Sequence, residues 1–339
     1  MKNLIRSFIL CCCFLRLSTA VLAQDVHFSQ FYQAPLHRNP ALAGLLHGDV
    51  RVQAVHRSQW NSVSAGYQTT SLNGEYKMPI GQGDDFLTLG LRLLNDQAGT
   101  SRLTTTQVLP VLNFHKALSA DRNSYLSIGF SGGYVQRRFD RSRITTNSQY
   151  EGTGDGEEVN NGNAFAYADG AIGASYNARF GESPENNYFI GAAYHHFHRP
   201  RHTFFSGTGR QLDPRLVFSG GLRFGVTETT VLTLEADHTR QGAYTETVGG
   251  FLYGLKIGSD FEDPDYTLSG GLFLRWNDAL IPTLKLDYHP FSVSLSYDVN
   301  LSPLRTASGG QGGFELGLLY AGFLPRDNSS LNAVRCPRY

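Results

Sequence analysis

Three neighbouring histidines, His195, His196 and His198, are the first residues whose type and spacing could do chemistry. Histidine is a common zinc ligand, but a zinc site needs more than two protein ligands, and the sequence places no third partner beside the two histidines that could share a face. In an extended strand His196 and His198 would share one face, and His195 would point to the other. We therefore expect a structural role for these side chains rather than a metal site.

The acidic, glycine-rich stretch with Asp155, Glu157 and Glu158 could bind calcium, which prefers carboxylate oxygens. It lacks the spacing of an EF-hand loop, so a solvated loop explains it better. No G-x-S-x-G is present, and spacing supports no Ser-His-Asp arrangement. We predict no enzymatic activity, no cofactor and no metal site.

The glycines within 129–133 lie inside a predicted strand, not between a strand and a helix, so they do not predict a phosphate loop. Glycine in a strand allows bending or the close approach of another backbone. We expect these glycines to let the strands bend or to let another segment approach the wall.

Nearly the whole chain alternates between apolar and polar residues, and the clearest stretch is 291–300, FSVSLSYDVN. Successive side chains of a strand face opposite sides of a sheet, so this stretch predicts a strand with one apolar and one polar face. No amphipathic helix pattern interrupts the series. We predict fourteen strands, at 49–59, 66–78, 86–95, 103–116, 124–137, 164–178, 187–198, 215–226, 230–239, 243–257, 266–276, 280–288, 291–300 and 313–323.

A sheet of this kind suits either a soluble sandwich or barrel, with the apolar face inward, or a membrane barrel, with that face toward lipid. The chain contains 37 glycines, 17 tyrosines and 22 phenylalanines but only 2 methionines, as expected for a barrel with aromatic girdles. So regular an alternation over so many strands favours the membrane barrel.

The lengths of the connections support a barrel with both ends in the periplasm. The long polar gaps 139–163, 199–214 and 300–312 all follow odd-numbered strands, whereas 227–229 and 289–290 follow even-numbered ones. In bacterial membrane barrels the extracellular loops are long and the periplasmic turns are short. We therefore predict that the long connections are extracellular.

Residues 1–23 are predicted to be a cleaved secretory signal peptide, because Lys2 and Arg6 precede an apolar run at 8–15. Cleavage would leave Cys336 as the remaining cysteine, so no disulfide within the chain is expected. It would also remove three basic residues and no acidic ones, which changes the net charge from 0 to −3. A nearly neutral chain gives no electrostatic case for binding nucleic acid.

The segment 24–48 precedes the predicted barrel at 49–323, and a tail at 324–339 follows it. Two prolines and a glycine interrupt regular structure in the segment, and its aromatic residues Phe28, Phe31 and Tyr32 need burial. Burying such a side chain contributes about 1.5–3 kcal/mol. We predict that the segment packs inside the barrel or across its periplasmic mouth and narrows the lumen.

Four residues are candidates for a special role in partner binding or structure: Asn39, Pro40, Arg57 and Trp60. The plainer alternative is architecture, with Asn39 and Pro40 forming a turn and Trp60 anchoring the chain at the membrane interface.

The N-terminal stretch HFSQFYQAPLHRNPALAG, followed by a strand and then HRSQWNS, resembles the opening of the PorP/SprF family of type IX secretion membrane proteins. The stretch 301–316, which includes LSPL, SGGQGG and FEL, resembles the family's late strand-loop-strand, and the ending RCPRY resembles its short C-terminus. The resemblance covers the chain from Gln24 to Tyr339, although His56 stands where the family often has an aromatic residue.

The resemblance implies an outer-membrane barrel of a Gram-negative bacterium that serves type IX secretion or gliding motility. It implies as partners a secreted adhesin or other type IX cargo, which the barrel helps to export or to hold at the cell surface. Other secretion components and the lipid of the outer membrane are the remaining expected partners. The alternative is a transport barrel for a small or hydrophobic solute, which an open lumen would favour.

Overall fold

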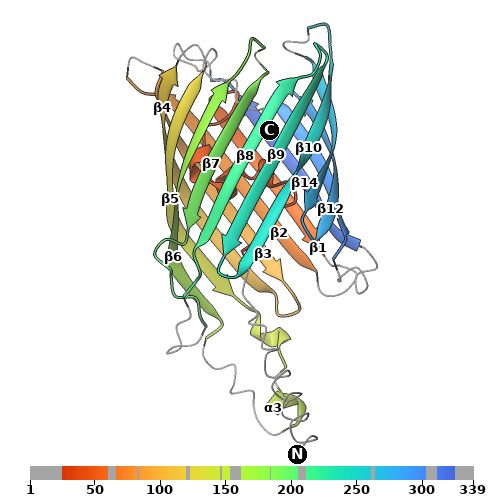
Figure 1. The fold of residues 1–339 in the computed structure, drawn as a ribbon. Helices are drawn as coiled ribbons and strands as arrows, with labels where there is room; N and C mark the ends of the chain where they lie inside the picture. The colour runs from red at the N-terminus through yellow and green to blue at the C-terminus, as the bar shows by residue number, and fades with distance from the viewer. Residues whose placement is uncertain are drawn as a thin grey trace, which may run out of the picture.

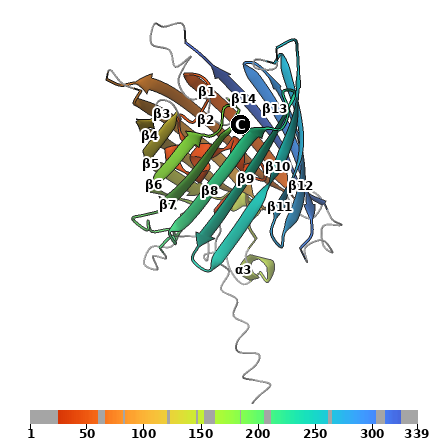
Figure 2. The same ribbon diagram turned by 45° about the horizontal axis from the view of Figure 1, so that its top comes forward.

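The computed structural model describes residues 25–59, 66–81, 84–119, 123–145, 147–152, 162–183, 185–204, 211–260, 264–302 and 311–324. Within these ranges fourteen strands form one closed barrel. Each strand pairs antiparallel with its neighbours in sequence, and β1 closes the barrel against β14. Figures 1 and 2 show the strands running obliquely around a single wall.

The strands are β1 (Val50–Gln59), β2 (Tyr67–Pro79), β3 (Phe86–Ala98), β4 (Leu103–Ser119), β5 (Ser124–Arg138), β6 (Ala164–Arg179), β7 (Asn187–His195), β8 (Arg215–Gly225), β9 (Thr230–Gln241), β10 (Tyr244–Ile257), β11 (Tyr266–Arg275), β12 (Ala279–Tyr288), β13 (Phe291–Asn300) and β14 (Gln311–Gly322).

The predicted fold, an antiparallel membrane barrel of about fourteen strands, is confirmed. β3 and β4 run three residues further than predicted, to Ala98 and Ser119, and β7, which was predicted to run to residue 198, ends at His195. It ends because the next residue, His196, has a φ of 55°, which extended backbone cannot have. The prediction that His196 and His198 share a face is therefore wrong: His196 is buried and His198 is exposed.

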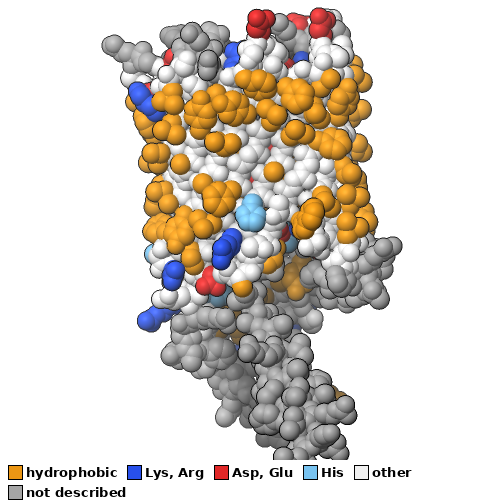
Figure 3. Space-filling view, viewed as in Figure 1, with side chains coloured by type: hydrophobic (Ala, Val, Ile, Leu, Met, Phe, Trp, Pro, Cys, Tyr) orange, Lys and Arg blue, Asp and Glu red, His pale blue; other side chains and the backbone are white. Residues whose placement is uncertain are grey.

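Apolar side chains lie on the outside of the wall and polar ones face the lumen. On β13, Val293 and Leu295 are 42% and 41% exposed, whereas Ser294 and Ser296 are 1% and 4% exposed. Figure 3 shows many apolar side chains on the outer surface, with charged ones near its two ends. This arrangement is that of a membrane barrel rather than of a soluble barrel with an apolar core.

The longest connection, between β5 and β6, contains the short helix α3 (Asn147–Tyr150), which lies beyond the bottom of the barrel in Figure 1. The odd-numbered strands end at this mouth, which we call the long-connection mouth. None of the helices among the described residues is long and apolar enough to cross a membrane.

The N-terminal segment lies inside the barrel, and we call residues 25–49 the plug. It contains three short turns, η1 (Phe31–Gln33), α2 (Pro35–Arg38) and η2 (Pro40–Leu42). The red and orange ribbon of Figure 1 shows these turns enclosed by the strands. The two prolines stand at the first positions of α2 and η2, where a missing N–H costs nothing.

Candidate functional site

The plug crosses the barrel from one mouth to the other. At its start, the Asp25 N–H donates to the side chain of Gln241, the last residue of β9, at the long-connection mouth. At its end, the Asp49 N–H donates to the carbonyl of Gly322, the last residue of β14, at the opposite mouth. The plug therefore occupies the length of the lumen and not the periplasmic mouth alone.

Asn39 fixes the middle of the plug to the wall. Its side-chain oxygen accepts a hydrogen bond from the Ala41 N–H at 2.8 Å and caps η2. Its side-chain nitrogen donates to the carbonyls of Ala174 on β6 and Ala192 on β7, at 3.1 and 3.2 Å. Asn39 is fully buried, and one side chain thus joins the plug to two strands.

Three glycines make room for this contact. A Cβ on Gly173 of β6 would lie 1.9 Å from the Asn39 side-chain oxygen, and one on Gly191 of β7 would lie 2.8 Å from its nitrogen. A Cβ on Gly129 of β5 would lie 2.4 Å from the carbonyl carbon of Pro40. Wall glycines therefore let Asn39 and Pro40 approach, and among the glycines at 129–133 the expected approach of another segment occurs at Gly129.

Arg38 forms a buried ion-pair cluster with β9. Its guanidinium lies 3.2 Å from a Glu235 carboxylate oxygen and 2.5 Å from one of Asp237, with a second contact to Asp237 at 2.8 Å. It also lies 4.8 Å from the centre of the Phe31 ring and 5.6 Å from that of Phe189. Two carboxylates and two ring faces compensate a cation that is removed from water.

Arg57 forms a second buried cluster, near β13 and β14. It lies 2.9 Å from an Asp298 carboxylate oxygen and 2.7 Å from one of Glu315. The Glu315 carboxylate also accepts the main-chain N–H groups of Ser29 and Gln30, at 2.6 and 2.7 Å. The wall therefore satisfies polar backbone of the plug as well as its own charges.

The far end of the plug is held in the same way by β2 and β4. The Glu75 carboxylate accepts the Gly44 N–H at 2.8 Å and pairs with Arg51 at 2.6 Å. Asn113 donates to the carbonyls of Ala41 and Ala43, at 2.9 and 2.7 Å. The plug is therefore bound by side chains of strands all around the barrel.

The aromatic residues of the plug pack against apolar residues of the lumen wall. The Tyr32 ring stacks on Phe273 with centroids 5.2 Å apart, and Phe31 meets Phe273 edge to face at 5.7 Å. Both belong to a buried cluster that includes Val248 and Ile281. Burial of these rings, predicted from their type alone, holds the plug by the hydrophobic effect.

A charged cluster holds the start of the plug at the long-connection mouth. The Asp25 carboxylate lies 2.7 Å from His196 Nε2 and 3.4 Å from Arg215. The other ring nitrogen of His196 lies 2.8 Å from Asp169 of β6. Burial alone would lower the pKa of His196, but the two carboxylates raise it to about 9. Burial alone would raise the pKa of Asp25, but His196 and Arg215 bring it well below its usual value.

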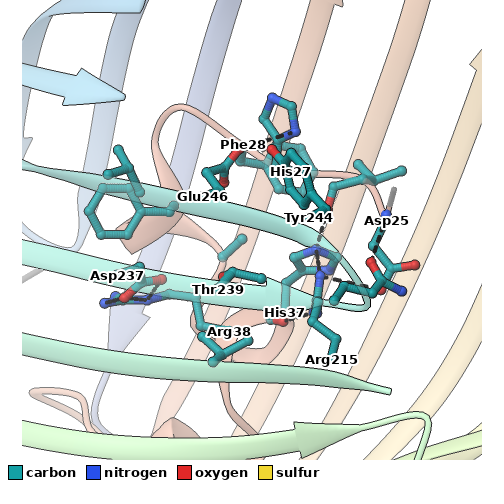
Figure 4. Close-up of a pocket in the computed structure, with 16 residues that line it drawn as sticks. Asp25, His27, Phe28, His37, Arg38, Arg215, Asp237, Thr239, Tyr244 and Glu246 are labelled. Carbon is teal, nitrogen blue, oxygen red and sulfur yellow. Dashed lines mark hydrogen bonds and ion pairs between the residues drawn. The ribbon is translucent and has the colours of Figure 1, made fainter. Parts of the chain in front are cut away.

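A cavity of about 50 Å³ remains between the start of the plug and β8 to β10. Figure 4 shows Arg38 against Asp237 on one side of it, and Arg215 pointing toward His37 and Asp25 on the other. The cavity has room for a few water molecules. Lumen-facing wall residues elsewhere, such as Ser71, are fully buried.

Three of the four candidate residues, Asn39, Pro40 and Arg57, lie at the contact between plug and wall. Trp60 lies outside the described residues. Sequence reasoning missed Arg38 and its carboxylates Glu235 and Asp237. The two acids lie two residues apart on the polar face of a strand, a pattern that indicates lumen position but not which cation they meet. Among the described residues, no group of three or more His, Cys, Asp and Glu could hold a metal ion.

Three solved structures are among those similar to the chain. The CymD monoaromatic hydrocarbon channel is 10% identical, with a TM-score of 0.49 over 89% of this chain and 96% of that one. The toluene transporter TbuX of Ralstonia pickettii is 12% identical, with a TM-score of 0.46 over 86% and 94%. CdiB from Acinetobacter baumannii is 8% identical, with a TM-score of 0.46 over 80% and 60%.

No curated protein matches the sequence. A family model described as type IX secretion system membrane protein PorP/SprF matches residues 20–320.

Proposed function

The chain belongs to the PorP/SprF family of type IX secretion system membrane proteins, and we propose that it is a plugged, non-enzymatic barrel that binds a secreted protein. The bound protein, such as an adhesin, would be helped through export or held at the cell surface. Other components of the secretion system are the further partners that membership of the family implies. A role in gliding motility belongs to the same proposal.

The single observation that carries this proposal is the occupied lumen. The plug contacts β1, β2, β4, β6, β7, β9 and β14 through hydrogen bonds and ion pairs, and its side chains from Phe28 to Leu46 are buried. A barrel used for free diffusion needs a water-filled passage. A lumen filled in this way instead leaves the rims and connections to do the work, by binding other proteins.

The proposed mature chain begins at Gln24, after cleavage of residues 1–23. Its start would then lie at the long-connection mouth, where Asp25 is bound to His196 and Arg215. Long connections of bacterial barrels face the outside of the cell. The secreted partner would therefore bind at the surface of this mouth and not in the lumen.

A deletion strain tests the function. Without the gene, surface display of the secreted partner should be lost, while uptake of small solutes should remain normal. Complementation with the full chain should restore display, and an unrelated outer-membrane barrel should keep its abundance throughout as a control. Normal display in the deletion strain, together with defective uptake of a small apolar solute, would contradict the proposal in favour of a transporter.

A further inference from the structure

One stretch of β6 has no strand on one side. β6 pairs with β5 along Ala164–Asn177, but β7 pairs with β6 only along Ala171–Arg179. Within the described chain, residues 164–168 therefore have a ladder partner on the β5 side alone. The β5–β6 hairpin also reaches further toward the bottom of Figure 1 than β8 and β9 do.

The backbone groups on this open side can be identified. The Gly170 carbonyl accepts the His196 N–H at 2.9 Å, and the Ala168 carbonyl lies 2.8 Å from His198 Nε2. Backbone groups of alternate residues point to the same side of a strand. The N–H and carbonyl of Ala166, and those of Ala164, therefore face the side where β7 has ended.

The plug itself explains why β7 stops. His196, the first residue after β7, leaves extended conformation with its positive φ, and its ring is held between Asp169 and Asp25. A Cβ on Gly170 would lie 2.7 Å from the ring of Phe197, so this residue folds over the outer face of β6 there and does not continue the ladder. Beyond this point the edge of β6 is uncovered by β7.

The lumen-facing side of this stretch is aromatic, with Phe165 packed on Phe204 at 4.6 Å between ring centres, whereas exposed arginines lie around its outer side. Ala164, Ala166 and Ala168 are exposed, and their small side chains leave the backbone accessible. Exposed arginines flank them: Arg138 pairs directly with Ala164, and Arg199 follows His198, which reaches the Ala168 carbonyl. Arg201 is also exposed. The nearby carboxylate of Asp140 is bound by Arg143 at 3.2 Å.

We propose that the edge of β6 at residues 164–168 is a docking site for an extended, acidic segment of the secreted partner, which adds a strand to the barrel wall. Free N–H and carbonyl groups of an edge strand give affinity to such an addition without demanding one sequence. The exposed arginines select an acidic segment and speed its encounter. The identity of the partner rests on the proposed function, but the edge itself does not.

The test uses the purified full-length protein and fluorescent peptides of about ten residues, a length that covers a strand. One peptide alternates threonine or valine with glutamate, a second carries lysine in place of glutamate, and a third carries a central proline. Fluorescence anisotropy should show binding of the acidic peptide alone, with affinity that falls as salt rises. Equal binding of all three peptides, or of none, would overturn the proposal.

Variants of the edge complete the test. Ala166→Pro removes an N–H on the open side and leaves the ladder with β5 intact, since edge strands tolerate proline there. This substitution should weaken binding of the acidic peptide at least about tenfold, which corresponds to about 1.4 kcal/mol. The matched control, Ala166→Val, keeps the N–H and should bind as the unchanged protein does. Heat-modifiable migration on gels confirms that both variants are folded. Unchanged affinity in a folded Ala166→Pro variant would overturn the proposal.

Hydrogen exchange separates the edge from the function. The Ala166 amide should exchange fast in the free protein and slowly with the acidic peptide bound. Slow exchange in the free protein would mean that another segment of this chain covers the edge, which overturns the proposal. Loss of partner display in the deletion strain with no peptide binding would refute the edge alone, whereas peptide binding with normal display would refute the function alone.

Discussion

At the scale of residues, buried charges specify where the plug lies. Two buried arginines at the plug contact, Arg38 and Arg57, each meet two carboxylates of the wall, and both are almost completely buried. Removing charges from water is costly, and an ion pair compensates that cost only in good geometry. Such pairs therefore favour one position of the plug over others more than they add stability.

Arg57→Ala should destabilise the protein by about 3–5 kcal/mol, because Glu315 would remain buried without its paired cation and Asp298 would keep Arg275 alone. Urea unfolding in detergent measures the loss. Lys116→Ala is the matched control, since Lys116 pairs with Asp85 while 58% exposed, and its loss should change the free energy of unfolding far less. Equal effects of the two substitutions would show that the buried cluster contributes no more to stability than an exposed ion pair does.

The cluster around Asp25 should make docking of the plug depend on pH. The pKa of His196 is raised from 6.5 to about 9, so its stabilising contribution is complete below pH 6.5 and is lost as pH rises through about 9. The pKa of Asp25 is lowered from 3.8, so its contribution is complete above pH 3.8 and is lost as pH falls below that value.

A protease can cut residues 25–28 only when the start of the plug has left the wall. This cleavage should therefore be slowest between about pH 4 and 6.5 and faster near pH 10. The cleavage is measured at each pH after correction for the protease's own pH profile on an unfolded substrate. His196→Gln, which cannot carry the charge, should remove the alkaline rise. A rise that persists in this variant would show that another group is responsible.

At the scale of elements, the plug needs strands that carry glycine where it approaches them closely. Gly129, Gly173 and Gly191 lie on three adjacent strands, and each would carry its Cβ into Asn39 or Pro40. The plug and this side of the wall are therefore shaped for each other, because a larger residue at any of these three positions would meet the plug.

Gly173→Ala should loosen the plug, because its Cβ would lie 1.9 Å from the Asn39 side-chain oxygen. Overpacking of this kind typically costs about 1–3 kcal/mol. Faster protease cleavage within the plug and a lower unfolding temperature would report it. Gly74→Ala is the control, since its Cβ would meet no atom within 4 Å. If both variants resist protease as the unchanged protein does, the close approach of Asn39 does not matter.

The strands could be predicted from the sequence, whereas the partners of the plug could not. Alternation along β13 is a local pattern, so its number of residues, its faces and the lumen position of Ser294 follow from the sequence. The end of β7 depends on His196 meeting Asp25, which is 171 residues away in sequence. Arg38 and Asp237 are 199 residues apart, and no local pattern connects them.

At the scale of the whole molecule, the sequence predicted that the plug enters the barrel but not that it extends to the long-connection mouth. Its aromatic residues needed a buried site, and the lumen is the site that the barrel offers. That it reaches the long-connection mouth depends on the Asp25 cluster with residues of β6 and β8. The result is a barrel closed along its length, with its accessible polar surfaces at the two mouths.

The conductance of the purified protein in planar bilayers tests this closure most directly. The intact protein should show little steady conductance, because the plug fills the lumen. Removal of residues 24–44 should open the lumen and raise the conductance, provided that heat-modifiable migration shows the barrel to be folded. A large, stable conductance of the intact protein, unchanged by that deletion, would contradict the account and favour a transport barrel.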